Sequence, residues 1–511
     1  MNHWIILPIL LPAIVAPLLV LAARYDLTLA RTLSLSAAVL GLALALGLFL
    51  SASDSSVPQV YALGDWPAPF GIVLVLDRLS ALMLMLAALL SLVVLLYAIG
   101  DGDGRGRHFH ALWQFQVMGI NGAFLTGDFF NLFVFFEVLL IASYGLMVHG
   151  GGAQRVRAGV QYVVVNLVGT TLVLSAVGLI YSVTGTLNMA DLAVKVPEVA
   201  AGDRALLHAG ALLLLLVFGV KAALVPVHFW LPGTYGSTSA VVAALFAIMT
   251  KVGAYSILRL YVLAFGSEAG ASALLAAPWL LPAAMLTLTL GMIGVLGARS
   301  LSQLASFAVI GSMGTLLISV GLFTAQATSA ALYYMLHSTL AVAALFLVAE
   351  QVGLRRKSAG EALIVGLKFE SRSLLAALFF VNAIALVGLP PLSGFIGKLL
   401  VLDAARDSAS VVWIWALVLS TSLLALVGFA RAGSTVFWKE TVKPNFRHRS
   451  IPGTPLPPRL PLVAIGVLLA GLVLLTAFAG PVSVWLDEAA TQLYQPSHYI
   501  DAVLGAAGEN E

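Results

Sequence analysis

The segment Val387-Gly-Leu-Pro-Pro-Leu-Ser-Gly-Phe-Ile-Gly-Lys398 interrupts a long apolar stretch with two adjacent prolines and carries a lysine just beyond them. Because proline lacks an N–H, the Pro390–Pro391 pair leaves the carbonyls of Leu386 and Val387 without their helical partners. Inside a membrane, such carbonyls need water or a polar side chain. The segment therefore predicts a membrane helix that is broken near its middle, with a polar cavity beside the break.

A second segment, Lys221-Ala-Ala-Leu-Val-Pro-Val-His-Phe-Trp-Leu-Pro232, repeats this pattern in the first half of the chain. Pro226 frees the carbonyl of Ala222, next to Lys221. A single proline in a membrane helix is often a harmless kink, but a lysine beside each of two breaks favours a functional role. Proline-interrupted spans at matching positions of two halves are typical of a transport site built from inverted repeats.

The composition places the rest of the chain in a membrane as well. Of 511 residues, 61% are hydrophobic and only 10% are charged, whereas a soluble protein has about 25% charged residues. The absence of cysteine excludes disulfides, iron–sulfur clusters and thiolate metal sites. The small net charge of +3 reflects basic loops, so we expect no nucleic-acid partner. The apolar run from Trp4 lacks a basic leader and is expected to be a retained first helix.

Apolar runs long enough to cross about 30 Å of hydrocarbon predict an all-α polytopic membrane protein with about fourteen transmembrane helices. The predicted spans are 4–23, 28–51, 77–99, 109–126, 128–148, 157–183, 206–230, 238–265, 273–298, 302–323, 328–351, 372–403, 410–437 and 460–480. We expect four regions: the first three helices (1–108), two inverted five-helix repeats (109–265 and 266–437), and a C-terminal region (438–511) with a linker, the last helix and an outer tail.

The basic residues of the loops give these spans an orientation. Loops after odd-numbered helices carry eighteen lysines and arginines, whereas the opposite loops carry only Lys195, Arg204 and Arg406. Since basic loops stay in the cytoplasm, both termini are predicted to face outward. The run Pro444–Pro458 is then a cytoplasmic linker. The mildly amphipathic tail 481–511 is expected to lie on the membrane surface or on a partner.

The ionisable residues within the predicted spans include four that should lie in lipid: Glu137, Lys221, Lys251 and Lys398. A lysine at the middle of a membrane helix costs about 3 kcal/mol, so a chain that keeps three of them is expected to use them. Glu137 lies among aromatic residues, and Lys221 is its natural partner, although a purely structural ion pair would explain both. Lys251 has no acidic residue at helical spacing, which suits a group that alternates between charged and neutral forms.

Two histidines and several hydroxyl groups extend this set. His337 is deep in its span and could bridge Lys251 to Lys398 through water, or simply bond a neighbouring helix. His228 could serve an access channel or cap a helix. Tyr144, Thr250 and Ser338 could hold water, but ordinary interhelical bonding would explain them equally well. Asp77 and Arg78 are expected to form an interfacial pair, and Asp128 is expected to cap the fifth helix.

Together these motifs resemble the antiporter-like subunits of respiratory complex I. The resemblance covers nearly the whole chain and rests on Glu137, on 221–232, on Thr-Lys-Val-Gly-Ala-Tyr (250–255) and on 388–398. Within that superfamily, Trp-Leu-Pro-Gly-Thr-Tyr (230–235), Lys398 and the ending 496–505 are most similar to the D-type subunits of the Mrp-type, or Pha-type, multisubunit sodium or potassium/proton antiporters.

The resemblance implies fourteen helices and a mid-membrane polar axis of Glu137, Lys221, Lys251, His337 and Lys398. It also implies function only within a complex of six or seven subunits in the bacterial cell membrane. The partners would be subunits of types A, B, C, E, F and G, with H+ and either Na+ or K+ as cargo and no cofactor. Complex I relatives usually read Trp-Leu-Pro-Asp-Ala-His where this chain has residues 230–235, so the role of that segment is open.

Three functions remain to be separated at this point. The first is an ion-translocating antiporter subunit, a transporter and not an enzyme. The second is a proton-pumping membrane subunit of a complex I-like or hydrogenase redox complex, which would co-purify with flavin or iron–sulfur subunits. The third is a stand-alone solute carrier, which would transport as a purified single chain.

Overall fold

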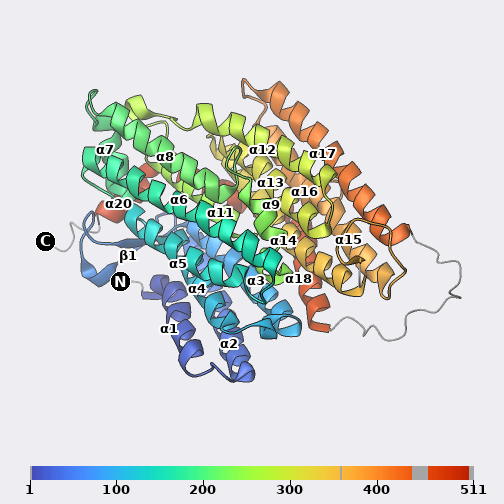
Figure 1. Ribbon diagram of the computed structural model, residues 1–511. Coiled ribbons are helices and arrows are strands. Elements are labelled where there is room, and N and C mark those ends of the chain that lie inside the picture. Colours follow the sequence, from blue (N-terminus) through green and yellow to red (C-terminus); the bar gives the residue numbers. More distant parts are fainter. Residues whose placement is uncertain (1–2, 357–358, 440–458, 506–511) are drawn as a thin grey trace, which may run out of the picture.

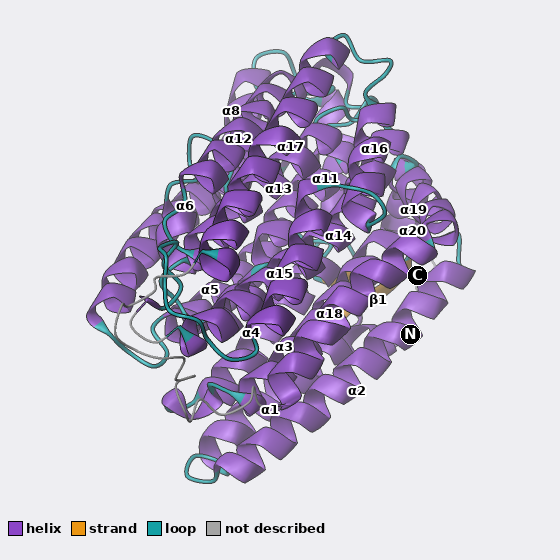
Figure 2. Cartoon of the chain, turned by 90° about the vertical axis from the view of Figure 1, so that its right-hand side faces the viewer, coloured by secondary structure: helices purple, strands orange, loops and turns teal. Residues whose placement is uncertain are grey.

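The chain folds into a bundle of membrane-length helices, as the composition predicts. The structure is a computed structural model that describes residues 3–356, 359–439 and 459–505. Within these residues, twelve helices are long and apolar enough to cross a membrane. They stand side by side, with α1 and α2 at one end of the molecule and α17 at the other (Figure 1). Helices also dominate the view in Figure 2, where strand is confined to one small patch.

The helices are numbered in chain order. Their bounds are α1 (Leu7–Leu21), α2 (Leu27–Asp54), α3 (Arg78–Gly100), α4 (Phe109–Leu125), α5 (Phe129–Met147), α6 (Ala153–Thr184), α7 (Met189–Lys195), α8 (Arg204–Ala222), α9 (Trp230–Tyr235), α10 (Ala240–Phe246), α11 (Met249–Leu263), α12 (Ala277–Gly297), α13 (Leu301–Val320), α14 (Ala325–Arg355), α15 (Arg372–Val387), α16 (Ser393–Ala404), α17 (Val411–Gly433), α18 (Arg459–Ala477), α19 (Ala479–Leu493) and α20 (Pro496–Gly505).

Each of the fourteen predicted spans coincides with one helix or with a pair of consecutive helices. The span 206–230 is divided between α8 and the start of α9, the span 238–265 between α10 and α11, and the span 372–403 between α15 and α16. The count of fourteen crossings stays a prediction, because α4 and α15 are shorter than the twelve membrane-length helices found in the described residues. The division into two inverted repeats also stays a prediction.

The loop predicted at 52–76 contains structure that the sequence analysis did not foresee. Strands β1 (Gln59–Ala62) and β2 (Val73–Leu76) pair antiparallel, with Gln59 opposite Leu76 and Ala62 opposite Val73. All four residues of β2 are buried, because the strand lies under the ends of α3 and α4. The short helix α7 lies in the loop predicted at 184–205.

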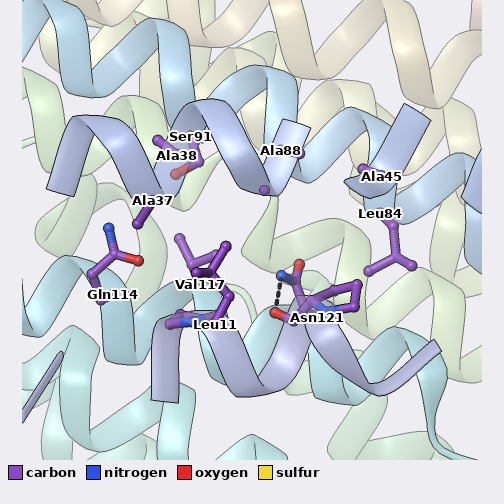
Figure 3. A pocket seen from close by; sticks show the side chains of 13 residues that line it. Leu11, Ala37, Ala38, Ala45, Leu84, Ala88, Ser91, Gln114, Val117 and Asn121 are labelled. Atoms are coloured by element: carbon purple, nitrogen blue, oxygen red, sulfur yellow. Dashed lines mark hydrogen bonds between the residues drawn. The ribbon is translucent and has the colours of Figure 1, made fainter. Parts of the chain in front are cut away.

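Buried amide side chains join α4 to α1 and α2 around a small pocket of about 30 Å³ that the first four helices line (Figure 3). The Asn121 amide of α4 donates to the Pro8 carbonyl of α1 at 2.8 Å. The Gln114 amide, two turns earlier in α4, donates to the Ser34 hydroxyl of α2 at 3.0 Å. A pocket of this size holds little more than water. These polar residues therefore connect helices and do not form a substrate site.

The described part of the C-terminal tail packs on the chain's own helices, and its predicted place on the membrane surface or on a partner stays a prediction. Helix α19 lies against α14 and α3, and α20 lies against α7. The Trp485 ring stacks on Phe49 of α2, and its indole N–H donates to the Ser53 hydroxyl at 2.9 Å. The predicted linker Pro444–Pro458 lies outside the described residues.

Two expectations for helix starts had different outcomes. Asp128 caps α5 as predicted, since its carboxylate accepts from the N–H of Asn131 at 2.8 Å. The predicted Asp77–Arg78 pair is wrong. Asp77 instead forms a buried bidentate pair with Arg259 of α11 at 2.5 and 2.8 Å, and Arg78 pairs with Glu488 of α19.

The two most enclosed membrane-length segments among the described residues carry Lys251 and His337. The most apolar stretch of α10 and α11 is entirely buried, and that of α14 is 94% buried. By contrast, only 22% of the residues in the most apolar stretch of α2 are buried, and only 28% in the segment that contains α17. These helices therefore expose apolar faces. Lys251 and His337 therefore lie in the centre of the bundle, screened by other helices.

Candidate functional site

The first break follows Lys221, which is 8% exposed at the end of α8. The helix ends because Ala223 adopts a left-handed conformation, with φ of 55° and ψ of 42°. The Trp230 indole N–H donates to the Val220 carbonyl at 3.1 Å, and the Val225 N–H donates to the Thr287 hydroxyl at 2.9 Å. Neighbouring side chains thus bond two backbone groups beside Pro226, and neither of them bonds the Ala222 carbonyl that the proline was predicted to free.

The Lys221 amine points across to α6 instead. It donates to the Asn166 side-chain oxygen at 2.8 Å. Glu137 of α5 is half-buried, and it accepts from the Thr170 hydroxyl at 2.6 Å, one turn further along α6. The Lys221 amine is thus bonded to Asn166, and its pairing with Glu137 stays a prediction. Two polar residues of α6 therefore connect the carboxylate and the amine.

Lys251 lies at an irregular point of its span. Between α10 and α11 the hydrogen bonds tighten to the i→i−3 pattern, as in Ala247 N–H to Ala244 O at 3.3 Å and Lys251 N–H to Ile248 O at 3.0 Å. Such a stretch inside a helix often marks a functional position. The Lys251 side chain is completely buried, and its amine has no hydrogen-bond partner among the described residues.

The second break uses its lysine on the backbone itself. Helix α15 ends at Val387, and Gly388 follows with a φ of 82°, a conformation that favours glycine. The Lys398 amine of α16 donates to the Val387 carbonyl at 2.7 Å and to the Ser422 hydroxyl of α17 at 2.8 Å. This carbonyl is one of the two that the Pro390–Pro391 pair was predicted to free.

His337 of α14 lies between the two lysines of the second half. Its Nδ1 is 2.9 Å from the Ser393 hydroxyl at the start of α16, and its Nε2 has no partner among the described residues. The ring lies within electrostatic range of both Lys398 and Lys251. The structure therefore brings Lys251, His337 and Lys398 into one buried group.

The four auxiliary residues have more ordinary surroundings. The Thr250 hydroxyl bonds the Ala247 carbonyl in the turn before α11 at 3.4 Å, and the Ser338 hydroxyl bonds the Met335 carbonyl of its own helix at 3.3 Å. Tyr144 is half-buried, with its ring edge-on to Tyr162 at 5.5 Å. His228 is half-buried between α8 and α9 and does not cap α9, which begins without a side-chain cap.

Several side chains that bond the predicted residues or their backbone were not identified from the sequence. They are Asn166, Thr170, Ser393, Ser422, Trp230 and Tyr235. Asn166 and Thr170 had a signal, since two polar residues four apart share one face of an apolar helix. Tyr235 belongs to the segment whose role was open, and its hydroxyl donates to the Phe246 carbonyl at 2.8 Å, at the loosened turn before Lys251.

The arrangement is suited to moving protons between side chains. The carboxylate of Glu137, the amines of Lys221, Lys251 and Lys398 and the imidazole of His337 come from α5, α8, α11, α16 and α14, and groups of these types can accept and release protons. Within residues 3–356, 359–439 and 459–505, no group of three or more histidine, cysteine, aspartate or glutamate side chains is placed to hold a metal ion.

Comparison with known proteins gives a consistent family. A family model described as "NADH:quinone oxidoreductase/Mrp antiporter, TM" matches residues 126–425, more than half of the chain. The chain is 40% identical to the D-type subunit of a probable K+/H+ antiporter of Rhizobium meliloti, over 99% of this chain and 98% of that protein. It is 39% identical to the D-type subunit of a Na+/H+ antiporter of Bacillus subtilis, over 99% of this chain and 100% of that protein.

A solved structure supports the same comparison. A chain of the Mrp complex from Dietzia sp. superposes with a TM-score of 0.87 and 30% sequence identity. The match covers 99% of this chain and 100% of that chain, so the likeness extends over the whole fold.

Proposed function

Because the chain belongs to the NADH:quinone oxidoreductase/Mrp antiporter family, we propose that it exchanges protons for a monovalent cation as the D-type subunit of a multisubunit Na+/H+ or K+/H+ antiporter. It is a transporter subunit, not an enzyme. Its relatives of 39–40% identity are named antiporter subunits over nearly their full length, which favours this function over that of a redox-complex subunit.

The partners are the other membrane subunits of such a complex, as in the Mrp complex to which the chain is similar. The chain is a multi-pass membrane protein. Its orientation in the bacterial inner membrane, with both termini outside the cytoplasm, is part of the proposal. It is supported by the eighteen basic residues in one set of loops against three in the other.

The proposed relay runs from Glu137 to Lys221 and on through Lys251 and His337 to Lys398. The observation that carries it is the place of the His337 ring, which is completely buried in α14 and bonds Ser393 at the start of α16, the helix that carries Lys398. The Lys251 amine is buried without a hydrogen-bond partner among the described residues, and burial disfavours the charged form of an amine. The lysines could thus alternate between charged and neutral forms as protons arrive, with water between them.

The test uses inside-out membrane vesicles that contain the whole complex, with cation-dependent collapse of ΔpH as the measurement. We expect Glu137→Ala and Lys221→Ala to reduce antiport at least about ten-fold, since each removes a titrating group. Lys195→Ala is the matched control, because this lysine lies on the short helix α7 and pairs with Asp191 of its own turn. Normal antiport in an assembled complex with either relay substitution would refute the assigned roles.

The identity of the co-purifying subunits separates the proposal from the redox alternative. Small membrane subunits are expected with this chain, whereas flavin or iron–sulfur subunits would indicate a dehydrogenase or hydrogenase.

A further inference from the structure

A cavity of about 190 Å³ lies far from the relay, among the end of α1, the start of α2 and the loop between α3 and α4. One part of its wall is apolar, with Leu19, Leu27 and Phe109. The other part is basic, with Arg24, Arg107 and His110. A wall that is apolar on one side and cationic on the other fits an amphipathic anion.

The cavity keeps an excess of positive charge. The Asp103 carboxylate in its wall is fully engaged, because it accepts from Arg31 at 2.6 and 2.7 Å and lies 3.1 Å from the His110 ring. Burial raises the pKa of Asp103, but hydrogen bonds and charges from Arg31 and His110 outweigh burial and lower it to about 2. The carboxylate is therefore ionised, and its negative charge is balanced by the paired Arg31.

Arg24 and Arg107 remain available to a ligand. Both are exposed, and among the described residues neither guanidinium forms a side-chain ion pair or hydrogen bond. Arg24 lies only over the ring of its neighbour Tyr25, at 5.2 Å. The nearby Asp26 carboxylate is committed to the backbone N–H groups of Thr28 and Leu29, at 2.9 and 3.0 Å.

One further set of donors and one unpartnered ring nitrogen face this region. Helix α4 begins after His108, which adopts a left-handed φ of 62° and gives no side-chain cap, so the first N–H groups of a seventeen-residue helix are left for an anion. His110, in the first turn of α4, is 3% exposed and lines the cavity. Its Nδ1 has no hydrogen-bond partner in the part of the chain that the structure describes.

We propose that this cavity binds the phosphate headgroup of an anionic phospholipid, with Arg24, Arg107 and the start of α4 on the phosphate. A lipid is favoured over free phosphate because the cavity lies at the ends of α1 and α2, two membrane-length helices with mostly exposed apolar faces. Leu21 and Tyr25 beside it are 80% and 85% exposed. Acyl chains can therefore continue from the apolar wall along α1, as expected for a basic site at a membrane surface.

The test is binding of phosphatidylglycerol to the purified, delipidated complex, followed by native mass spectrometry and by the apparent melting temperature. We expect phosphatidylglycerol to bind and stabilise, and phosphatidylcholine to do so much less. The double substitution Arg24→Ala/Arg107→Ala should weaken phosphatidylglycerol binding roughly ten-fold or more, since each basic residue near anionic lipid adds to the attraction. The matched control is Arg157→Ala, an exposed arginine on α6 outside the cavity, which should leave binding unchanged.

The remaining outcomes each decide against part or all of the proposal. Equal binding by the double variant and the parent would overturn the site. Equal stabilisation by phosphatidylcholine would overturn the requirement for an anion. Equal protection by millimolar inorganic phosphate would overturn the lipid as the source while leaving an anion site. All these surface arginines can be replaced without loss of buried contacts, so normal assembly of the variants is expected and is checked by co-purification.

Discussion

The two broken helices use their lysines in different ways. At the first break, Lys221 bonds Asn166 on a neighbouring helix, while Trp230 and Thr287 bond backbone groups beside the break. At the second break, Lys398 itself bonds the Val387 carbonyl. A change of charge at Lys221 therefore leaves its break intact, whereas a change of charge at Lys398 alters a donor to its own backbone. The comparison suggests that only the second break couples titration to helix geometry.

The largest expected effect comes from the space around the second break. A Cβ at Gly394 would lie 1.9 Å from the Ala385 carbonyl oxygen and 2.8 Å from His337 Nε2, whereas a Cβ at Gly219 in α8 would meet nothing closer than 3.4 Å. We expect Gly394→Ala to destabilise the protein by roughly 3 kcal/mol through overpacking and to abolish antiport. Gly219→Ala should be tolerated. Both are measured by complex yield and vesicle antiport, and equal tolerance of the two would show that the second break is not the tighter one.

The next effect concerns the backbone role of Lys398. Lys398→Met should lower the free energy of unfolding by about 2 kcal/mol, because it orphans the buried Val387 carbonyl. Lys221→Met should change it less, because it removes a donor from the Asn166 side chain and not from the backbone of the break. The apparent melting temperature of the purified complex measures the difference. Equal shifts for the two variants would contradict the proposed difference between the breaks.

A smaller effect is expected from Trp230, whose indole N–H bonds the backbone at the first break. Trp230→Phe keeps an aromatic ring but removes the N–H that bonds the Val220 carbonyl. We expect a loss of about 1 kcal/mol with antiport largely kept. Trp279→Phe is the control, since Trp279 is 61% exposed. Unchanged stability in Trp230→Phe would mean that the first break does not depend on this side chain.

The smallest expected effect is on the pH dependence of stability. It concerns Glu361 and Asp103, two carboxyl groups in the loops that carry most of the basic residues. Burial raises the pKa of Glu361, although Ser302 opposes the shift, whereas the pKa of Asp103 is lowered to about 2. A raised carboxyl pKa means that stability falls as pH rises from the unfolded value, about 4.3, through the folded pKa. Glu361→Gln should therefore remove a loss of melting temperature that the parent complex shows on raising the pH above about 4.3. An unchanged pH slope would contradict the buried state of Glu361.

The sequence was sufficient for the features that depend on local pattern. Pro226, Pro390 and Pro391 located both breaks, because a missing N–H acts on its own helix. The burial of Lys251 and His337 away from lipid was predictable, because a charged or polar side chain is costly in an apolar span. These expectations needed no knowledge of which helices are neighbours.

Features that depend on helix rotation and neighbour choice could not be predicted in the same way. Asn166 and Ser422 are polar residues in apolar helices, and only the packing of α6 and α17 turns them toward the lysines. Asp77 and Arg78 are adjacent in sequence, yet they take partners from α11 and α19. Adjacency of two opposite charges in sequence therefore does not predict that they pair, because each can pair with a residue of another helix.

The relay is tested at its central member, His337. His337→Asn can still bond Ser393 but cannot carry a proton, and Ser338→Ala is the neighbouring control because the Ser338 hydroxyl bonds its own helix. Cation-dependent ΔpH collapse should be lost in vesicles with assembled His337→Asn complex and kept with Ser338→Ala. Antiport at the parental rate in His337→Asn would contradict a continuous path from Lys251 to Lys398.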